Sequence, residues 1–419
     1  MALSRSQLPD PALVLQQEIA TLAARPSVRS ACASLITHEP TFAKWQLDMA
    51  RIPAPPFGEQ ARSDWLLERF IDIGLEHVQI DEVGNVFGVH RGSDEKLLAL
   101  SAHLDTVFPA GTPLNVRQEG SRLYGPGVSD NGAGVAALLA IAYTLAKQQV
   151  RHGLSVLFIG NVGEEGEGDL RGMRHIFSQR RWLDSIVCQL VLDGAGADTI
   201  VAEALGSRRF EVILRGPGGH SWSDFGAPNP IVALARTVDR FARNQVPSTP
   251  KTTFNIGVVR GGTSVNSIPE SASMRVDIRS TSTVEIDRLE QALRTALEQA
   301  VQDETQVAEA RSPGGRRSPT LSSEIVGIGS RPAGELPSGA RILQVIRAVD
   351  AHLGNVAQVQ RASTDANVPL SLGREAVAIG GGGTGGGAHT LHEWFDCTSR
   401  DLGLKRILLT TLALAGGGK

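Results

Sequence analysis

The chain has 419 residues, of which 41% are hydrophobic and 20% charged, and its formal net charge is −3 at pH 7. This length predicts two or three domains with a large core, and the nearly balanced charge argues against a nucleic-acid partner. The three cysteines lie far apart and form no C-x-x-C pair, so neither a disulfide framework nor a thiolate zinc site is expected.

No apolar run reaches the roughly 18–20 residues that span a bilayer. The first residues, Met-Ala-Leu-Ser-Arg-Ser-Gln, lead into a mixed polar helical pattern and lack the apolar segment of a signal peptide. We therefore expect a cytoplasmic protein without a membrane partner.

Up to about residue 206, helical patterns alternate with strand-like ones. Helical spacing with proline breaks covers 12–50, and a second helical pattern begins at Trp65. Short apolar runs typical of strands occupy 86–89, 97–102, 154–162 and 187–192. The segment 133–143 is apolar almost all round, which indicates a helix buried in a large core. Together these features predict an α/β domain with a mixed, mostly parallel sheet covered by helices on both faces.

From about residue 208 the pattern changes to an alternation of apolar and polar residues, seen in 208–215 and again in 272–279. Such alternation is typical of strands with one face in water, and hence of an antiparallel sheet. Two helical patterns accompany it, at 231–243 and 286–301, and 311–319 is a loop by composition. Helix and buried-strand patterns return after about 333. We therefore predict an α+β domain at 207–332, inserted between two parts of one α/β domain, 1–206 and 333–419.

Residues that can bind metal follow several of the predicted strands. They are His103, Asp105, Glu164, Glu165, Asp193 and, after a glycine-rich segment, His389. Asp130 immediately precedes the predicted buried helix. Because ligands of open α/β sheets bind beyond the carboxyl ends of the strands, we expect these side chains to meet there.

Each of these residues has an ordinary structural interpretation when taken alone: Asp130 would cap a helix, and His103 would be a satisfied, partly buried histidine. Their joint occurrence favours a metal centre, because several carboxylates and two histidines at the ends of apolar strands are costly to bury unpaired. Imidazole and carboxylate without thiolate suit Zn²⁺, with Co²⁺ or Mn²⁺ as replacements. The number of carboxylates indicates two ions bridged by one of them.

The run Gly380-Gly-Gly-Gly-Thr-Gly-Gly-Gly387 stands out in a chain with 46 glycines. A flexible linker is one interpretation. Because a buried-strand pattern precedes the run and metal-capable residues follow it, we favour a tight loop whose backbone approaches a ligand.

These residues resemble the motifs of the M20 family of zinc metallopeptidases and amidohydrolases, and they come in the family's order. The matching segments are His103-Leu-Asp-Thr-Val, Tyr124-Gly-Pro-Gly-Val-Ser-Asp-Asn-Gly-Ala-Gly134, Gly163-Glu-Glu-Gly-Glu-Gly168, Asp193-Gly and Ala388-His-Thr-Leu-His-Glu393. Segments similar to the family's lid, or dimerisation, domain are Gly218-Gly-His-Ser221, Gly261-Gly-Thr-Ser-Val-Asn-Ser-Ile-Pro269 and Val276-Asp-Ile-Arg279.

The resemblance implies a role for each candidate. Asp130 would bridge two zinc ions; the remaining ligands would be His103 and Asp193 for one ion and Glu165 and His389 for the other. Asp105 would hydrogen-bond the far nitrogen of His103 and so fix the orientation of the ring. Glu164 would be the general base, which takes a proton from the water held between the ions and delivers it to the leaving amine.

The resemblance places substrate contacts in the inserted domain. His220 would reach a substrate oxygen or the developing oxyanion, either within one chain or across a dimer interface. Asn266 and Arg279 would hold a carboxylate or carbonyl of the substrate, although Arg279 shares a strand face with Asp277 and an ordinary ion pair is the alternative. A homodimer formed through the inserted domain is also implied.

Two positions depart from the commoner family pattern. Asn131 follows Asp130 where many relatives carry an acidic or Met residue, and His392 stands where many relatives carry Asp. Either His389 or His392 could therefore be the ligand, and we choose His389 because it closely follows the glycine run. These departures leave the substrate preference open.

The expected function is hydrolysis of a peptide or related amide bond at a two-zinc centre, by an exopeptidase acting on short peptides. An N-acyl-amino-acid deacylase or amidohydrolase with the same centre is the alternative, and the sequence does not separate the two. A non-catalytic metal-binding protein on the same scaffold is a second alternative, against which the retained Glu164 and Asp105 argue. A Rossmann-type nucleotide site is poorly supported, because the third glycine of its fingerprint is absent.

Overall fold

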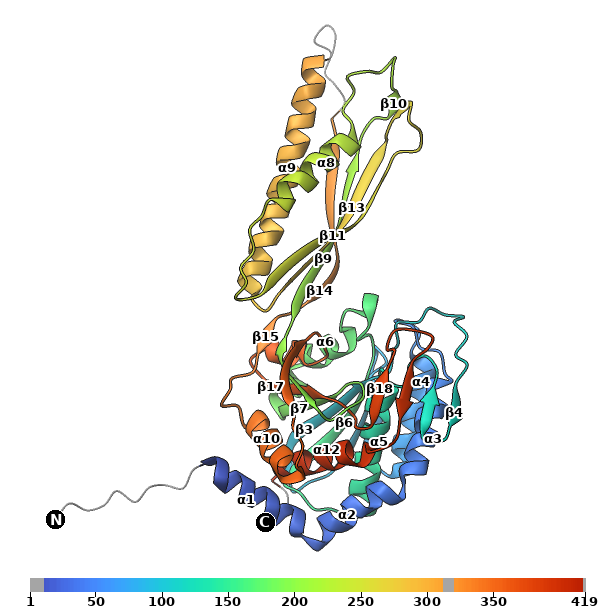
Figure 1. Ribbon diagram of the computed structural model, residues 1–419, viewed down its shortest axis with the longest axis vertical. Coiled ribbons are helices and arrows are strands. Elements are labelled where there is room, and N and C mark those ends of the chain that lie inside the picture. The colour runs from blue at the N-terminus through green and yellow to red at the C-terminus, as the bar shows by residue number, and fades with distance from the viewer. Residues whose placement is uncertain (1–10, 312–319, 417–419) are drawn as a thin grey trace, which may run out of the picture. The chain divides into compact units, whose positions relative to one another are not determined.

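The computed structural model describes residues 11–311 and 320–416. It divides the chain into two compact units: a first unit of Met1–Ala204 with Glu335–Lys419, and a second unit of Leu205–Gly334 (Figure 1). The predicted domain limits lie within two residues of these, and the predicted loop lies outside the described residues from 312 to 319. Within the described ranges, no helix is both long and apolar enough to cross a membrane.

The first unit begins with four helices, in the segments where helical spacing of apolar residues predicted them. They are α1 (Pro11–Ala24), α2 (Pro26–Thr37), α3 (Glu39–Ala50) and, after a proline-rich turn, α4 (Gln60–Ile73). In α2 and α3 a proline occupies the first helical turn, where its missing N–H costs no helical hydrogen bond. Gly74 ends α4 in the left-handed conformation that favours glycine.

The central sheet of the first unit is mixed and mostly parallel, as predicted. Its order is β1 (Glu76–Ile80), β2 (Val86–His90), β6 (Leu154–Asn161), β3 (Asp94–His103), β7 (Ile186–Leu192), β17 (Glu375–Ile379), β8 (Thr199–Ala204) and β15 (Gly334–Glu335), with β16 (Gln358–Ala362) beside β8. Strand β3 pairs in parallel with both β6 and β7, and β17 pairs in parallel with β7. The carboxyl ends of these four strands therefore lie along one edge of the sheet.

Helices cover both faces of this sheet. Successive residues of a strand point to opposite faces, so the apolar residues of β3 pack against helices on both sides. Leu98 and Leu100 of β3 pack in a cluster with the side chains of α5 (Gly132–Lys147). Leu97 and Ala99 pack on the other face with those of α6 (Arg171–Ser178). Helix α5 is buried on nearly all sides, as its uninterrupted apolar sequence predicted.

Shorter elements complete the first unit. The remaining helices are α7 (Arg180–Ser185), α10 (Arg341–Leu353), α11 (Asn367–Ser371), α12 (Arg400–Leu414) and the 3₁₀ turn Gly166–Gly168. A small antiparallel sheet has the order β18 (Thr384–Gly386), β19 (Trp394–Asp396), β5 (Arg122–Tyr124) and β4 (Arg117–Glu119). This sheet places the segment after the glycine run beside the segment before α5.

The glycine run is tightly packed, but against the chain's own backbone. A Cβ added to Gly380 would lie 2.5 Å from the carbonyl oxygen of Ala195, and one added to Gly381 would lie 2.5 Å from that of Ala133. The linker interpretation is therefore wrong. The close approach that we expected toward a ligand is, at these two positions, an approach toward the loop after β7 and the first turn of α5.

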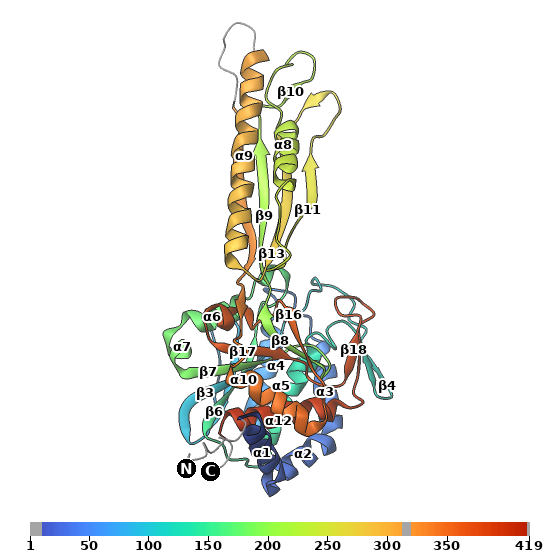
Figure 2. The same cartoon turned by 60° about the vertical axis from the view of Figure 1, so that its left-hand side comes forward.

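The second unit is an antiparallel sheet with two helices on one face, as predicted (Figure 2). The sheet order is β11 (Thr252–Gly261), β13 (Ser271–Ser280), β9 (Gly206–Arg215) and β14 (Ser322–Arg331), and the helices are α8 (Pro230–Ala242) and α9 (Thr283–Arg311). A two-residue ladder joins β10 (Gly219–His220) to β12 (Ser267–Ile268). Val212 and Met274 from the sheet and Leu234 and Leu293 from the helices share one apolar core.

Helix α9 is ten residues longer at its end than the predicted 286–301. The apolar spacing stops at residue 301 because Glu304 takes the next core-facing position. Glu304 is buried, accepts a hydrogen bond from the main-chain N–H of Asn229 at 3.1 Å and pairs with Arg236 at 3.0 Å. A buried carboxylate at a core-facing position thus interrupts the hydrophobic period, so the period does not predict the last turns of the helix.

Candidate metal centre

The five predicted ligand residues converge at the carboxyl edge of the central sheet. His103 is the last residue of β3, Glu165 follows β6, and Asp193 follows β7. Asp130 lies in the loop before α5, and His389 lies in the loop after β18. Their ligand atoms form two groups in which every atom lies within 4.8 Å of the others: His103 with Asp130 and Asp193, and Asp130 with Glu165 and His389.

Asp130 belongs to both groups because its two oxygens face different histidines. Its Oδ1 lies 3.2 Å from Nε2 of His103, and its Oδ2 lies 3.1 Å from Nε2 of His389. Nε2 of His389 also lies 3.0 Å from Oε1 of Glu165, and Nε2 of His103 lies 3.8 Å from Oδ1 of Asp193. This arrangement is the one that a bridging carboxylate requires.

The separations between donor atoms suit metal coordination. Two ligands of a tetrahedral ion with metal–ligand bonds of about 2.0–2.2 Å lie about 3.3–3.5 Å apart. The four histidine–carboxylate separations, from 3.0 to 3.8 Å, bracket this value. Each group combines imidazole with carboxylates and contains no thiolate, so the donor set fits Zn²⁺, Co²⁺ or Mn²⁺.

The carboxylates of the cluster favour the protonated forms of both histidines. Burial opposes protonation of His103, yet Asp105, Asp130 and Asp193 raise its pKa well above the usual value. The hydrogen bond with Asp130 raises the pKa of His389 to about 9. A divalent cation would replace these protons, because a ligating imidazole must be neutral.

The pKa values of Asp130 and Glu165 are shifted in opposite directions. Burial alone would raise the pKa of Asp130, but its contacts with the two histidines lower that pKa below the usual range. Burial raises the pKa of Glu165. Asp130 is therefore the more strongly ionised of the two.

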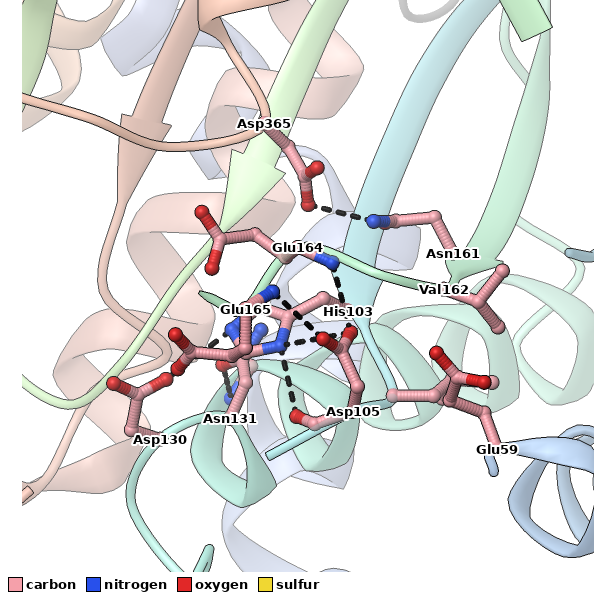
Figure 3. A network of polar contacts seen from close by, with 12 residues as sticks. Glu59, His103, Asp105, Asp130, Asn131, Asn161, Val162, Glu164, Glu165 and Asp365 are labelled. Carbon is pink, nitrogen blue, oxygen red and sulfur yellow. Dashed lines mark hydrogen bonds and ion pairs between the residues drawn. The ribbon is translucent and has the colours of Figure 1, made fainter. Parts of the chain in front are cut away.

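Asp105 contacts His103 differently from our expectation. The Nδ1 atom of His103 lies 3.1 Å from the main-chain carbonyl oxygen of Asp105 and 3.6 Å from the carboxylate, which is beyond a good hydrogen bond. The two carboxylate oxygens accept instead from the main-chain N–H groups of Glu164, at 3.0 Å, and Glu165, at 2.7 Å (Figure 3). Asp105 thus orients both the histidine and the Glu164–Glu165 pair.

Glu164 lies beside the two ligand groups. It is 5% exposed, and an oxygen of its carboxylate lies within 4.8 Å of ligand atoms of His103 and Glu165. Gly163, before it, has a φ of 68°, and a Cβ there would collide with Arg171. The turn that presents Glu164 and Glu165 to the cluster therefore depends on glycine.

His389 and His392 differ in their distance from the other candidate ligands. Both residues are exposed, but only His389 belongs to a candidate ligand group among the described residues. His389 has a φ of 65°, a left-handed conformation that is uncommon outside glycine and that turns its ring toward Asp130 and Glu165.

In the second unit the structure brings His220 and Asn266 together, but not Arg279. The main-chain N–H of Ser221 donates to the carbonyl oxygen of Asn266 at 3.0 Å, next to the β10–β12 ladder. Strand β13 begins close to this ladder, and Arg279 lies near its far end. At about 3.4 Å per residue, the strand separates the two positions by about 25 Å. It pairs with Asp277 at 2.6 Å, which is the ion pair that the sequence offered as an alternative.

Sequence patterns missed buried polar residues around the cluster. Asp365 lies in the loop before α11, is 1% exposed and accepts a hydrogen bond from Asn161 at 2.7 Å (Figure 3). Burial raises the pKa of Asp365 to about 7. No strand-end pattern marks this residue, so only the fold could reveal it.

The covered α/β sheet and the two ligand groups at its carboxyl edge define a candidate dinuclear metal centre. The model of Peptidase family M20/M25/M40 matches residues 99–412, and the chain belongs to this family.

Similar proteins include both peptidases and a deacylase. The chain is 29% identical over 230 residues to a probable carboxypeptidase of Ajellomyces dermatitidis, covering 51% of this chain and about half, 52%, of the relative. It is 27% identical over 286 residues to a succinyl-diaminopimelate desuccinylase of Burkholderia multivorans, covering 63% of this chain and 75% of the relative. A tripeptidase structure from Staphylococcus aureus shares the fold, with a TM-score of 0.72 at 21% identity over 90% of this chain and 98% of that one.

Proposed function

We propose that this protein is a hydrolase that cleaves a peptide or related amide bond at a centre of two zinc ions. The observation that carries the proposal is the position of Asp130, whose two oxygens each face a different histidine at 3.1–3.2 Å. A pair of cations would make use of both contacts at once. Co²⁺ or Mn²⁺ could replace zinc, because the donor set contains no thiolate.

The two ions would supply Lewis-acid polarisation of the scissile carbonyl and a lowered pKa for the attacking water. Glu164 would take the proton of that water and pass it to the nitrogen of the leaving amine. Asp105 would keep Glu164 within reach of the water, because its carboxylate accepts the main-chain N–H of Glu164. The neighbouring Glu165 would remain a ligand, so that each carboxylate of the pair has one task.

The experiment that tests this proposal is Glu164→Ala. It should keep both zinc ions, measured by atomic absorption, and lose about 10²–10⁴-fold in kcat, the usual contribution of a general base. Glu167→Ala is the matched control, because Glu167 lies three residues away and is exposed. Full activity in Glu164→Ala would contradict the assigned role, and zinc binding without turnover of any amide would favour a non-catalytic protein.

We propose short peptides as the substrates, cleaved by exopeptidase action. A probable carboxypeptidase among the relatives and a tripeptidase of the same fold support this choice. An N-acyl-amino-acid deacylase is the second candidate, which the desuccinylase relative favours. Turnover of a dipeptide and tripeptide panel beside N-acetyl and N-succinyl amino acids would decide between the two.

We also propose that the second unit forms a homodimer in which His220 acts on the partner's substrate. His220 is exposed and lies beside Asn266 at the β10–β12 ladder, so its side chain is accessible to a second copy of the chain. Mixing inactive Glu164→Ala with inactive His220→Ala protein should then restore activity, since a mixed dimer holds one complete site; no restoration would mean action within one chain.

A cytoplasmic location is proposed on the ground that all three cysteines are unpaired, which is usual in reducing compartments. Detection of the protein in a cell fraction with an antibody would test the location.

A further inference from the structure

Glu393 is a buried carboxylate outside the candidate ligand set, with an exposed fraction of 0%. Its Oε1 accepts hydrogen bonds from the main-chain N–H groups of Ser129 and Asp130, both at 2.7 Å, and its Oε2 accepts one from Gly127 at 2.8 Å. Hydrogen bonds to an ionised acceptor are roughly twice as strong as neutral ones. Glu393 therefore fixes the main chain of the loop that carries the bridging Asp130.

The same residue joins this loop to the segment that carries His389. Glu393 follows His389 by four positions, and its main-chain carbonyl oxygen accepts from the N–H of Gly125 at 3.0 Å. The next residue, Trp394, pairs with Tyr124 in the small antiparallel sheet. Two ligand segments far apart in the sequence are thus fastened to each other at Glu393.

Arg62 explains how the interior tolerates this charge. Arg62 is 1% exposed and donates to the main-chain carbonyl oxygens of Ile52, at 2.8 Å, and Leu104, at 2.7 Å. Burial lowers the pKa of Arg62 to about 10, although Asp105 and Glu393 act against this, and the side chain is still protonated at neutral pH. One buried cation therefore interacts favourably with both carboxylates that organise the ligand segments.

We propose that Glu393 is a positioning residue of the metal centre, which holds Asp130 between the two histidines by anchoring the main chain of its loop. This inference rests on the proposed two-zinc centre. Without the charge of Glu393, three buried N–H groups would have a weaker acceptor or none. The loop would then shift, and both ions would lose the geometry of their shared ligand.

The test is the zinc affinity of Glu393→Gln, measured by competition with a chromogenic chelator. Glutamine has the same length, but one of its two acceptor positions becomes an NH₂ group that faces a main-chain N–H. We expect both ions to bind about 10- to 100-fold more weakly, the usual loss when a group that supports a ligand is removed. The visible absorption of the cobalt-loaded protein should also change, because it reports the ligand geometry.

Asp350→Asn is the matched control, because Asp350 is a buried carboxylate of α10 that accepts from Arg406 at 2.7 and 2.9 Å. It should lower the unfolding temperature and leave zinc affinity unchanged. Unchanged zinc affinity in folded Glu393→Gln would overturn the inference, as would an equal loss in Asp350→Asn.

If Glu393→Gln does not fold, Glu393→Asp is measured in the same way and judged by the same two results. It keeps the charge but is too short to reach all three N–H groups. A wild-type protein that binds no zinc would refute the proposed function and this inference together. Two ions in the wild type with unaltered affinity in the variant would refute the inference alone.

Discussion

The shared position of Asp130 predicts a difference in zinc-dependent stability between two matched variants. Asp130 directs one oxygen to His103 and the other to His389, whereas Asp193 faces only His103. Asp130→Ala should therefore remove the stabilisation by both ions, and Asp193→Ala that by one. The two side chains are comparable in burial, with exposed fractions of 20% and 21%.

The magnitude follows from mass action. An ion that binds only the folded state, at a free concentration about 1,000 times its Kd, adds about 4.1 kcal/mol to the free energy of unfolding. The first unit has about 290 residues, so at about 2.1 cal/mol/K of unfolding entropy per residue this equals about 7 °C in Tm. Two ions would raise Tm by about 13 °C in the wild type; Asp193→Ala should keep about half of this rise and Asp130→Ala almost none.

Differential scanning calorimetry of chelator-treated protein, with and without added zinc, measures each shift. Each variant is compared with its own metal-free sample, because both substitutions also change the charge around protonated His103. Equal shifts in the two variants would refute the bridging role of Asp130. A full shift in Asp130→Ala would refute the two-ion centre altogether.

Three further predictions concern individual residues. His389→Ala should lose one zinc ion in a titration while His392→Ala keeps both, because only His389 joins a ligand group; loss of an ion in His392→Ala alone would reverse the assignment. Burial, together with the ring nitrogen of His152 at 2.7 Å, lowers the pKa of His90 to about 4. The pKa of His90 in the unfolded chain is about 6.5, so the neutral ring stabilises the fold above pH 6.5. This stabilisation is lost as the pH falls toward 4. His90→Gln should make urea unfolding less dependent on pH in that window, and an unaltered dependence would contradict this reasoning. Glu304→Ala should destabilise the second unit by about 1–3 kcal/mol in urea unfolding, because the partly buried main-chain N–H of Asn229 loses its acceptor; a change near zero would mean that α9 does not need this contact.

The architecture of both units was predictable because its signals are local. Continuous apolar runs indicated the buried strands and α5, and alternation indicated the antiparallel sheet of the second unit. The end of α9 was missed, because buried Glu304 breaks the hydrophobic period. The packing of Gly380 and Gly381 was also missed, because their neighbours, a loop and the first turn of α5, are distant in sequence.

The candidate ligands were predictable for a related reason. Parallel pairing of β6, β3 and β7 brings their carboxyl ends to one edge, so residues after the strands must meet. The detailed contacts were not predictable. Asp105 directs its carboxylate to two main-chain N–H groups rather than to the ring of His103, and nothing in the local pattern distinguishes these partners.

The amino-acid sequence by itself determined which side chains can bind metal and which strands carry them, because residue type sets the chemistry and short-range periodicity sets the strands. The tertiary structure alone decided which oxygen of Asp130 faces which histidine, and that buried Glu393, 263 positions away, anchors its loop. The physical reason is that a contact of 2.7 Å between such distant segments depends on how whole loops pack, and no local pattern encodes that path.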